Sequence, residues 1–354
     1  MRVALDGTPL TLSSGGLLRY TSELSRALAE NFPEDQFVLV SDQPFTTPPG
    51  GPANLKRGSG PRNILERRWW SWGIQRELWR ERAELFHGTD FAVPYLPLRP
   101  SVLSLHDLSP WMDTGWHQAA GRVRRRTPYL IGLGLATMVL TDSEAVRRQA
   151  IEWFRIPPQR IVAAPLAASA QFRPVDARPC RPYFLYAGTL EPRKNLALLL
   201  ETWREVRRQH AVDLVLAGRR RADFPELAPE PGLELLGEVA DEKLPALYSG
   251  ALACVCPSLY EGFGLPVLEA MQCGTAVIAS RDPAITEVCG GAALQLDSRD
   301  HRSWLEALSA AVSNPGLLQE WRSRALARAR EFSWARTARL TREVYREAVS
   351  RFIS

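Results

Sequence analysis

The chain has 354 residues, of which 45% are hydrophobic and 23% are charged. These proportions are ordinary for a globular protein and exclude a disordered or fibrous chain. The formal net charge of +5 suits a mildly attractive surface for anions, but it is too small to indicate a nucleic-acid-binding protein. At roughly 150 residues per domain, the length predicts about two domains.

The apolar runs and the cysteines exclude further classes. The longest nearly uncharged run, Tyr129–Leu140, is shorter than the about 20 residues of a membrane span, so we expect buried helix and strand there. No apolar stretch near Met1 is long enough for a signal peptide, which predicts a cytoplasmic protein. The five cysteines include no Cys-x-x-Cys and no nearby histidine pair, so we expect buried, reduced thiols rather than disulfides or zinc ligands.

Short β-rich runs alternate with amphipathic helical runs in the first half of the chain. The expected strands are Arg2–Leu5, Gln36–Ser41, Leu85–His87, Val102–Leu105, Met138–Thr141 and Arg160–Ala163. The expected helices are Leu18–Glu30, Asn63–Arg82 and Glu144–Phe154, the last with Asp142 or Ser143 as its N-cap. Residues 44–61 are rich in Pro, Gly and Thr, which predicts a mobile surface loop.

The same alternation resumes in the second half. The expected strands are Tyr183–Ala187, Val212–Ala217, Leu233–Leu236, Ala253–Cys256 and Ala276–Ala279. The expected helices are Lys194–His210, Glu242–Ser249, Pro266–Gln272 and a closing helix from Trp334 to Phe352. Repeated βα units predict parallel sheets covered on both faces, an α/β fold of the Rossmann type.

The proline-rich stretch Phe172–Arg181 indicates a stiff linker between two such domains. We therefore expect an N-terminal Rossmann-like domain over residues 1–172 and a C-terminal one over 173–331. The helix in residues 332–354 is expected to pack back on the N-terminal domain. Ligands of such sheets bind beyond the carboxyl ends of the strands, which places the expected site in a cleft between the domains.

One candidate site follows the strand that ends at Ala187. There Gly188 begins a tight turn, and Pro192, which suits the first turn of a helix, would put Arg193 and Lys194 at a helix amino terminus. Two fixed cations at the positive end of a helix dipole suit an anion, most naturally a diphosphate. On its own, this segment favours the simpler interpretation of a solvated helix start with surface cations.

A second candidate site follows the strand Ala253–Cys256. Glu261 and Glu269 are separated by seven residues across a Gly-x-Gly-x-Pro turn that contains Gly262, Phe263, Gly264 and Leu265. Glycines let backbone N–H groups approach a ligand closely, and each carboxylate can accept hydrogen bonds from paired hydroxyls. A nucleotide sugar, with two diols and phosphates between them, fits this layout better than the alternative of a helix-dipole partner and an exposed loop acid.

Together these two segments resemble the Arg-Lys and Glu-x7-Glu signatures of the family-4 retaining glycosyltransferases, which have the GT-B fold. Weaker matches span nearly the whole chain, and the opening strand and Leu105-His106-Asp107-Leu108 are most similar to the bacterial mannosyltransferase branch. The resemblance implies a retaining transferase, preferably using GDP-mannose, that acts on a glycan or lipid-linked acceptor. It implies attack on the same face of the sugar, with the leaving phosphate taking the acceptor's proton.

The resemblance also implies roles for individual residues. Arg193 and Lys194 would neutralise the diphosphate, Glu269 would hold the ribose hydroxyls, and Glu261 the hydroxyls of the transferred sugar. Backbone amides of Phe263, Gly264 and Leu265 would contact the sugar and phosphate. Gly16 would close over the diphosphate from the first domain, and Val239 and Lys243 would lie near the base. The family's glycine-containing run after Gly15-Gly16 is replaced here by Leu17-Leu18.

Two histidines follow strands of the first domain. A lone histidine is more often structural, and we keep that interpretation for His87. Because a donor motif is expected to face it, His106 is assigned contact with the sugar near the reacting carbon, and Asp107 would orient it or meet the acceptor. The sequence contains no Asp-x-Asp, so we expect no metal and no other cofactor, with protein cations stabilising the leaving group.

Three function classes remain distinguishable. A glycosyltransferase is favoured over a GT-B sugar-nucleotide epimerase, which would interconvert nucleotide sugars without an acceptor. A noncatalytic nucleotide-binding module does not explain two carboxylates beside two phosphate-binding cations. A nicotinamide dehydrogenase is disfavoured, because no Gly-x-Gly-x-x-Gly follows an early strand.

Tryptophans and arginines are interleaved in two segments of the first domain. One contains Trp69, Trp70, Trp72 and Trp79 among Arg67, Arg68, Arg76, Arg80 and Arg82, and the other contains Arg122, Arg124, Arg125 and Arg126. This composition suits a helix in the headgroup region of a membrane, which would give peripheral contact. The alternative, that Leu65, Trp69, Trp72 and Trp79 pack the helix onto its sheet, is favoured by their spacing.

Overall fold

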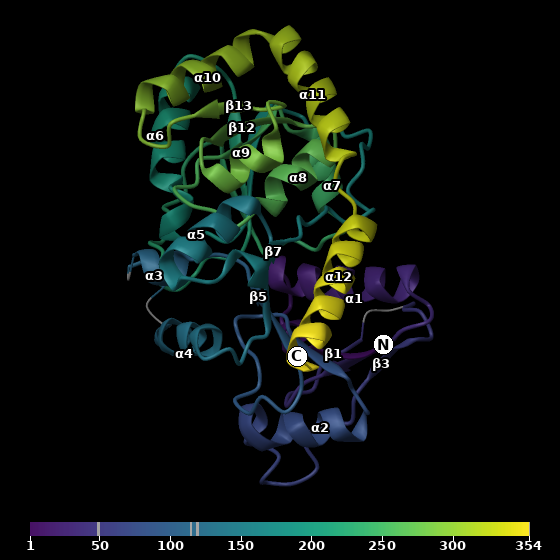
Figure 1. The fold of residues 1–354 in the computed structure, drawn as a ribbon. Coiled ribbons are helices and arrows are strands. Elements are labelled where there is room, and N and C mark those ends of the chain that lie inside the picture. Colours follow the sequence, from purple (N-terminus) through teal and green to yellow (C-terminus); the bar gives the residue numbers. More distant parts are fainter. Residues whose placement is uncertain (48–49, 114, 118–119, 354) are drawn as a thin grey trace. The chain divides into compact units, whose positions relative to one another are not determined.

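The computed structural model describes residues 1–47, 50–113, 115–117 and 120–353. The chain divides into two compact units, unit 1 with Met1–Leu166 and Ser333–Ser354 and unit 2 with Ala167–Phe332 (Figure 1). Phe172, expected to close the first domain, belongs to unit 2. The reason is that its ring packs against Tyr248, with ring centroids 6.0 Å apart, and its carbonyl accepts a hydrogen bond from Gln272.

Unit 1 is built on a 7-stranded parallel sheet in the order β3-β2-β1-β4-β5-β6-β7. Its strands are β1 (Arg2–Asp6), β2 (Gln36–Val40), β3 (Leu55–Arg57), β4 (Leu85–Gly88), β5 (Ser101–Leu105), β6 (Met138–Thr141) and β7 (Ile161–Ala163). The central strands are almost wholly buried, as expected for a parallel sheet covered on both faces.

Strand β3 lies inside the stretch expected to be a loop. It is a short edge strand whose Lys56 and Arg57 are exposed, so it carries no alternating apolar pattern that could indicate it. Phe37 of β2 pairs with Leu55 and fixes its register. The loop expectation was wrong for residues 55–57, and residues 48 and 49 of that stretch lie outside the described residues.

The helices of unit 1 are α1 (Gly16–Asn31), α2 (Ile74–Arg80), α3 (Ser109–Met112), α4 (Gly121–Gly132), α5 (Glu144–Phe154) and α12 (Trp334–Ile353). Helix α5 matches its expected bounds, and the Ser143 hydroxyl caps it by accepting a hydrogen bond from the amide of Val146. Helix α12 is held in unit 1 by contacts from Thr337 to the Pro165 carbonyl and from Arg342 to Asp35.

The single helix expected over Asn63–Arg82 is wrong. The segment forms turns, then a π-helical turn over Trp69–Gly73, and only then α2. The Asn63 side-chain oxygen accepts a hydrogen bond from the amide of Glu66 at 3.0 Å, as an N-cap residue does, but the turns that follow do not continue into a helix. The chain then passes so closely that a Cβ on Gly73 would lie 2.0 Å from the Glu66 carbonyl oxygen.

Unit 2 is built on a 6-stranded parallel sheet in the order β10-β9-β8-β11-β12-β13. Its strands are β8 (Tyr183–Ala187), β9 (Asp213–Ala217), β10 (Leu233–Gly237), β11 (Ala253–Cys256), β12 (Ala276–Ser280) and β13 (Leu294–Leu296). Its helices are α6 (Leu196–Arg207), α7 (Leu244–Gly250), α8 (Leu265–Gln272), α9 (Pro283–Cys289), α10 (His301–Ser313) and α11 (Pro315–Ala329). Trp203 of α6 and Trp304 of α10 are fully buried in one apolar cluster, so these two helices share the core (Figure 1).

Within the described part of the chain, every helix is either too short or too polar to cross a bilayer. Four of the cysteines are buried and free, as expected, but Cys180 is exposed. It lies in the proline-rich stretch before β8, where no sheet or helix covers it.

Candidate functional site

Two loops meet at the carboxyl edge of the unit 2 sheet because β8 and β11 are neighbouring strands. The loop after β8 carries Arg193 and Lys194, and the loop after β11 carries Glu261. Lys194 donates a hydrogen bond from Nζ to Glu261 Oε1 at 2.6 Å, and Arg193 donates from Nη1 to Oε2 at 3.2 Å. The two sequence motifs thus form one cluster of charges.

The local backbone differs from the expected helix start. Residues Pro192–Lys194 form a 3-10 turn, Asn195 follows in the left-handed region with φ 55°, and α6 begins only at Leu196. The Asn195 side chain stabilises this conformation by donating hydrogen bonds to the carbonyls of Pro257 and Ser298. Arg193 and Lys194 therefore lie in a 3-10 turn directly before the amino terminus of α6, and not within the helix that was expected to begin at Lys194.

The cluster is buried, and its charges determine the ionisation of Glu261. Lys194 and Glu261 are 8% and 7% exposed. Burial would raise the pKa of Glu261, but the positive charges of Lys194 and Arg193 outweigh it and lower the pKa to about 2. The Ser258 hydroxyl donates a further hydrogen bond to Oε1 at 2.7 Å. Glu261 is consequently an ionised acceptor over the whole physiological pH range.

A second carboxylate, Glu191, holds Arg193 from the other side. Its Oε1 lies 2.7 Å from Arg193 Nε in an ion pair, and its Oε2 accepts a 2.6 Å hydrogen bond from Arg221 Nη1. Arg221 in turn contacts Asp223. Sequence reasoning missed the roles of Glu191 and Arg221, although Glu191 stands directly before Pro192 and Arg221 closes a run of three arginines after β9.

Glycines shape both loops. Gly188 has φ +142°, and a Cβ on Gly218, which has φ +155°, would lie 1.9 Å from the Gly188 carbonyl oxygen, so the turns after β8 and β9 can approach only with glycine there. Gly264, with φ +99°, precedes Leu265, the first residue of α8. The ring of Phe263 packs against Phe332, with centroids 6.0 Å apart. Ligand contacts of Gly188, Gly262 and the amides of residues 263–265 stay predictions.

Glu269 lies one turn into α8 and is only 1% exposed. Tyr248 of α7 donates a 3.0 Å hydrogen bond to its Oε2. The predicted contact with ribose hydroxyls is not tested by these contacts.

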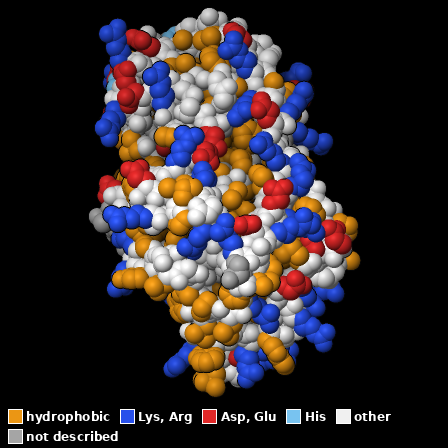
Figure 2. Space-filling model, viewed as in Figure 1, with side chains coloured by type: hydrophobic (Ala, Val, Ile, Leu, Met, Phe, Trp, Pro, Cys, Tyr) orange, Lys and Arg blue, Asp and Glu red, His pale blue; other side chains and the backbone are white. Residues whose placement is uncertain are grey.

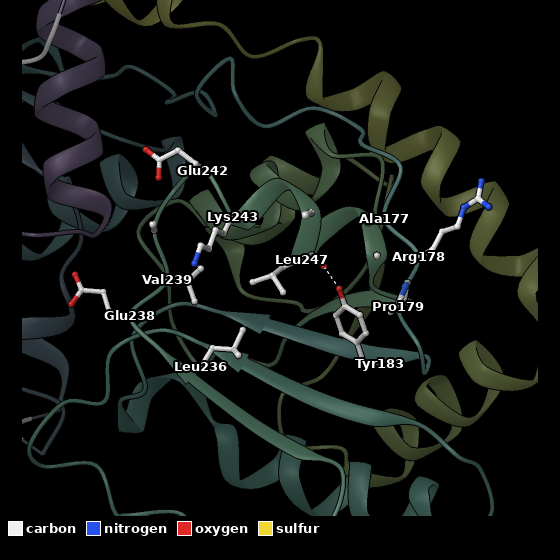
Figure 3. A pocket seen from close by; sticks show the side chains of 13 residues that line it. Ala177, Arg178, Pro179, Tyr183, Leu236, Glu238, Val239, Glu242, Lys243 and Leu247 are labelled. Carbon is white, nitrogen blue, oxygen red and sulfur yellow. Dashed lines mark hydrogen bonds between the residues drawn. The ribbon is translucent and has the colours of Figure 1, made fainter.

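A cavity of about 750 Å³ borders α7, which is within the usual range for small-molecule sites. Val239 and Lys243, the residues expected near the base, both line it. In Figure 3 their side chains lie close together at one end of the cavity, while Tyr183, whose hydroxyl donates to the Leu247 carbonyl, lies at the other. The cavity has an apolar wall, with Lys243 toward one end and Arg178 toward the other.

His106 of unit 1 follows β5 and is buried against residues that follow the two neighbouring strands. Its Nδ1 contacts Asp142 Oδ2 at 2.8 Å, and its Nε2 contacts the Thr89 carbonyl at 2.7 Å. Burial would lower the pKa of His106, but the charge of Asp142 outweighs it and raises the pKa to about 9. The imidazolium therefore donates from both nitrogens, and its contact with a sugar stays a prediction.

The suggestion that Asp107 orients His106 is wrong, because Asp142 does so. Asp107 Oδ1 instead accepts hydrogen bonds from the amide and hydroxyl of Ser109 at the start of α3. A contact of Asp107 with the acceptor stays a prediction. His87 is fully buried between Tyr345 and Ser104, and burial lowers its pKa to about 3, which confirms the structural role expected for it.

Gly16 is the first residue of α1, and Gly15 before it has φ +109° with open space around its missing side chain. Leu17 and Leu18 thus occupy the first turn of a long helix, whose free amides are of the kind that bind phosphate. The predicted contact of Gly16 with the diphosphate is untested. No group of three or more His, Cys, Asp or Glu side chains within residues 1–47, 50–113, 115–117 and 120–353 could hold a metal ion.

Two family models match the chain. One, described as Glycosyltransferase Family 4, matches residues 14–172, and the other, described as Glycosyl transferases group 1, matches residues 181–314. An Escherichia coli protein named O-antigen chain mannosyltransferase B is 35% identical over 289 residues, which are 74% of this chain and 74% of that protein. An MMP alpha-(1->4)-mannosyltransferase of Mycolicibacterium hassiacum is 30% identical over 250 residues, 67% of this chain and 58% of that protein.

Solved structures show the same fold. A sucrose-phosphate synthase from Thermosynechococcus elongatus matches with a TM-score of 0.78 at 20% identity over 98% of each chain. The Anabaena protein Alr3699/HepE, in complex with UDP and glucose, matches with a TM-score of 0.72 at 17% identity over 97% of this chain and 98% of that one. The predicted two-domain α/β GT-B fold is confirmed.

Proposed function

The chain belongs to glycosyltransferase family 4 and is a glycosyltransferase, and we propose that it transfers mannose from GDP-mannose to a glycan or lipid-linked acceptor with retention of configuration. The observation that carries this proposal is the buried cluster of Arg193, Lys194 and Glu261, which joins two cations to an ionised carboxylate. The 35% identity to an O-antigen mannosyltransferase supports mannose as the sugar.

The leaving group is stabilised by the two cations. When the bond between the anomeric carbon and the diphosphate breaks, negative charge grows on the phosphate and positive charge on the sugar ring. The Arg193 side chain is 13% exposed and Lys194 is 8% exposed, so water screens their positive charges only weakly. This protein charge makes a metal ion unnecessary in the proposed reaction, which needs no cofactor.

Glu261 is proposed to bind the transferred sugar rather than to attack it. Its oxygens already accept hydrogen bonds from Lys194, Arg193 and Ser258, which reduces their nucleophilicity. A carboxylate has about four acceptor positions, so one position remains for a sugar hydroxyl. In the proposed mechanism the acceptor attacks on the face of the leaving group, and the departing phosphate oxygen takes the acceptor's proton.

We assign the other donor contacts to further residues of unit 2 and to one glycine and one histidine of unit 1. Glu269 holds the ribose hydroxyls, Val239 and Lys243 bind the base, and the amides of residues 262–265 contact the sugar and phosphate. Gly16 contacts the diphosphate, and His106 contacts the sugar. We place the enzyme in the cytoplasm, in peripheral contact with the membrane.

A donor panel tests the proposal. GDP-mannose, GDP alone, UDP-glucose and UDP-galactose are compared by thermal shift and by release of free nucleotide. All ligands are compared at one concentration, where the ligand with the lowest Kd stabilises the native state most, by about 2.7 kcal/mol at 100 times its Kd. The preferred donor therefore gives the largest shift in melting temperature. The anomeric configuration of the product is then read by NMR. A larger shift and faster turnover with a UDP-sugar would overturn the donor assignment, and an inverted product would overturn retention.

A further inference from the structure

Unit 1 exposes large apolar side chains next to arginines around α2. Ile64, Leu65, Trp72 and Trp79 are 79%, 67%, 58% and 68% exposed, and Arg67, Arg68 and Arg76 are also exposed. We call these seven residues the α2 surface. Figure 2 shows hydrophobic side chains with Lys and Arg side chains beside them at the end of the molecule where Figure 1 places α2.

The fold separates the tryptophans of this segment into two sets. Trp69 is buried at 3% exposure, and Ile74 and Leu78 are buried with it against unit 1. Trp72, Arg76 and Trp79 follow one another at intervals of four and three residues, so they lie on the opposite, exposed side of the turn and helix. The packing role that the spacing favoured was therefore wrong for Leu65, Trp72 and Trp79, and correct for Trp69.

Two acidic residues of the segment face inward and the third, Glu81, pairs with Arg2, which leaves the α2 surface basic. Glu66 and Glu77 are buried, and both bind Arg80, with Nη1 2.9 Å from Glu66 Oε2 and Nε 3.1 Å from Glu77 Oε2. In the described part of the chain, Arg67, Arg68 and Arg76 make no salt bridge or side-chain hydrogen bond. Their charge is thus available to a partner.

Helix α4 carries an exposed stripe of its own. Arg122, Arg125, Tyr129 and Leu133 are exposed at intervals of three and four residues and form one stripe along the helix. The helix is joined to the α2 segment because the Arg126 guanidinium lies 5.4 Å from the centroid of the Trp70 ring. The two basic aromatic segments of the sequence are therefore neighbours in unit 1.

We propose that the α2 surface docks on a lipid bilayer that carries anionic headgroups. Indole rings favour the boundary between headgroups and acyl chains, aliphatic side chains insert below it, and arginines are attracted to the anionic surface. This inference extends the proposed peripheral contact to a defined surface and lipid class, and it does not depend on which sugar is transferred.

Other occupants fit the charges less well. A second copy of the chain that met the same surface symmetrically would bring arginines against arginines. A nucleic acid would explain the arginines and tryptophans, but not Ile64 and Leu65, which are the two most exposed aliphatic residues of the surface. An anionic bilayer uses the apolar and the basic side chains together.

The test is co-sedimentation of the full chain with vesicles of phosphatidylcholine, with or without phosphatidylglycerol. The Debye length falls from about 10 Å in 0.1 M salt to about 3 Å in 1 M salt, so binding through the arginines should weaken across that range. Trp72→Ser/Trp79→Ser and Arg67→Glu/Arg68→Glu are each expected to reduce pelleting with anionic vesicles at least about tenfold. Since all four side chains are exposed, circular dichroism and the melting temperature should stay unchanged.

Matched variants in other regions show whether the effect belongs to this surface. Trp153→Ser removes an exposed tryptophan of α5, and Arg208→Glu/Arg299→Glu makes the same change in net charge on unit 2. Both are expected to pellet like the wild type. The proposal is overturned if the wild type does not pellet with anionic vesicles, if the α2 variants bind as it does, or if the control variants lose binding equally. It is also overturned if light scattering shows that Trp72→Ser/Trp79→Ser abolishes a dimer while vesicle binding is absent.

Discussion

Lys194 and Glu261 form a buried ion pair, with Nζ 2.6 Å from Oε1. The cation predicted to bind the diphosphate and the carboxylate predicted to bind the sugar are therefore preorganised by each other before any donor arrives. Because both groups are almost excluded from water, the pair is fixed by its own charges and by Arg193. A donor that places its phosphate near Lys194 and its sugar hydroxyls near Glu261 therefore meets two charged groups that have already lost most of their contact with water.

Removing the cation tests this arrangement. We expect Lys194→Ala to lower kcat/KM for transfer at least about tenfold, because the leaving diphosphate loses a buried positive charge. Breaking a buried pair can also cost about 3–5 kcal/mol of stability, so activity is measured well below the melting temperature of the variant. Lys56→Ala, at an exposed lysine of β3, is the control. Wild-type turnover by a folded Lys194→Ala enzyme would contradict the phosphate assignment.

The ionisation of Glu261 predicts a pH dependence of stability. Its pKa in the folded protein, about 2, is below the ordinary value of 4.5. Its ionic contacts therefore stabilise the fold above about pH 4.5, and this contribution is lost as pH falls toward 2. We expect the difference in free energy of unfolding between the wild type and Glu261→Gln to shrink over that range, measured by urea denaturation.

Exposed Glu226 provides the matched control for this series, as Glu226→Gln. A difference between wild type and Glu261→Gln that stays constant from pH 6 to pH 3 would show that the low pKa is not linked to folding.

Glu191 is expected to act by positioning Arg193. Its carboxylate contacts Arg193 Nε and Arg221 Nη1 and is 5% exposed. In Glu191→Gln the charge that holds the guanidinium is lost, so we expect kcat to fall about tenfold while KM for the acceptor is unchanged. Glu191→Asp should restore part of kcat, and Glu230→Gln, which breaks a more exposed pair with Arg204 on the same unit, should not change it. Equal kcat in Glu191→Gln and wild type would refute the positioning role.

Metal independence is a further prediction. Arg193 and Lys194 supply the positive charge that a divalent ion supplies in other enzymes, so transfer should continue at the wild-type rate after dialysis against EDTA. A strict, reversible requirement for added Mg²⁺ or Mn²⁺ in a transfer assay would contradict it.

The fold was largely predictable because its strands are buried parallel strands with continuous apolar runs, such as Phe37–Val40 and Ala253–Cys256. Elements without that signal were missed. Strand β3 is polar and lies at a sheet edge, and β13 is only three residues long and half-buried, so neither carries a buried apolar run. The segment over residues 63–82 departs from a single helix where the chain brings Gly73 against the Glu66 carbonyl seven residues earlier, an approach that the spacing of apolar residues does not encode.

The candidate site was predictable where a motif concentrates unusual residues, as Arg193-Lys194 and Glu261 to Glu269 do. It was not predictable where a long-range contact assigns the partner. Asp142 lies 36 positions after His106 in the sequence and reaches it only because β5 and β6 are adjacent in the sheet. The sequence indicated Asp107, which adjoins His106, as the residue that orients it, but the Asp107 carboxylate accepts a hydrogen bond from the amide of Ser109.

The pair of His106 and Asp142 yields the last prediction. The pKa of His106 in the folded protein, about 9, is above its ordinary value of 6.5. Its protonated form therefore stabilises the fold fully below about pH 6.5, and that contribution is lost as pH rises through 9. We expect Asp142→Asn to destabilise unit 1 at pH 6 and to differ less from the wild type at pH 10, with His106 titration in both proteins followed by NMR. Asp113→Asn, at an exposed aspartate near α3, controls for charge. If the imidazole of the wild type titrated near 6.5, the carboxylate would not hold it protonated, and the pair would contribute no pH-dependent stability.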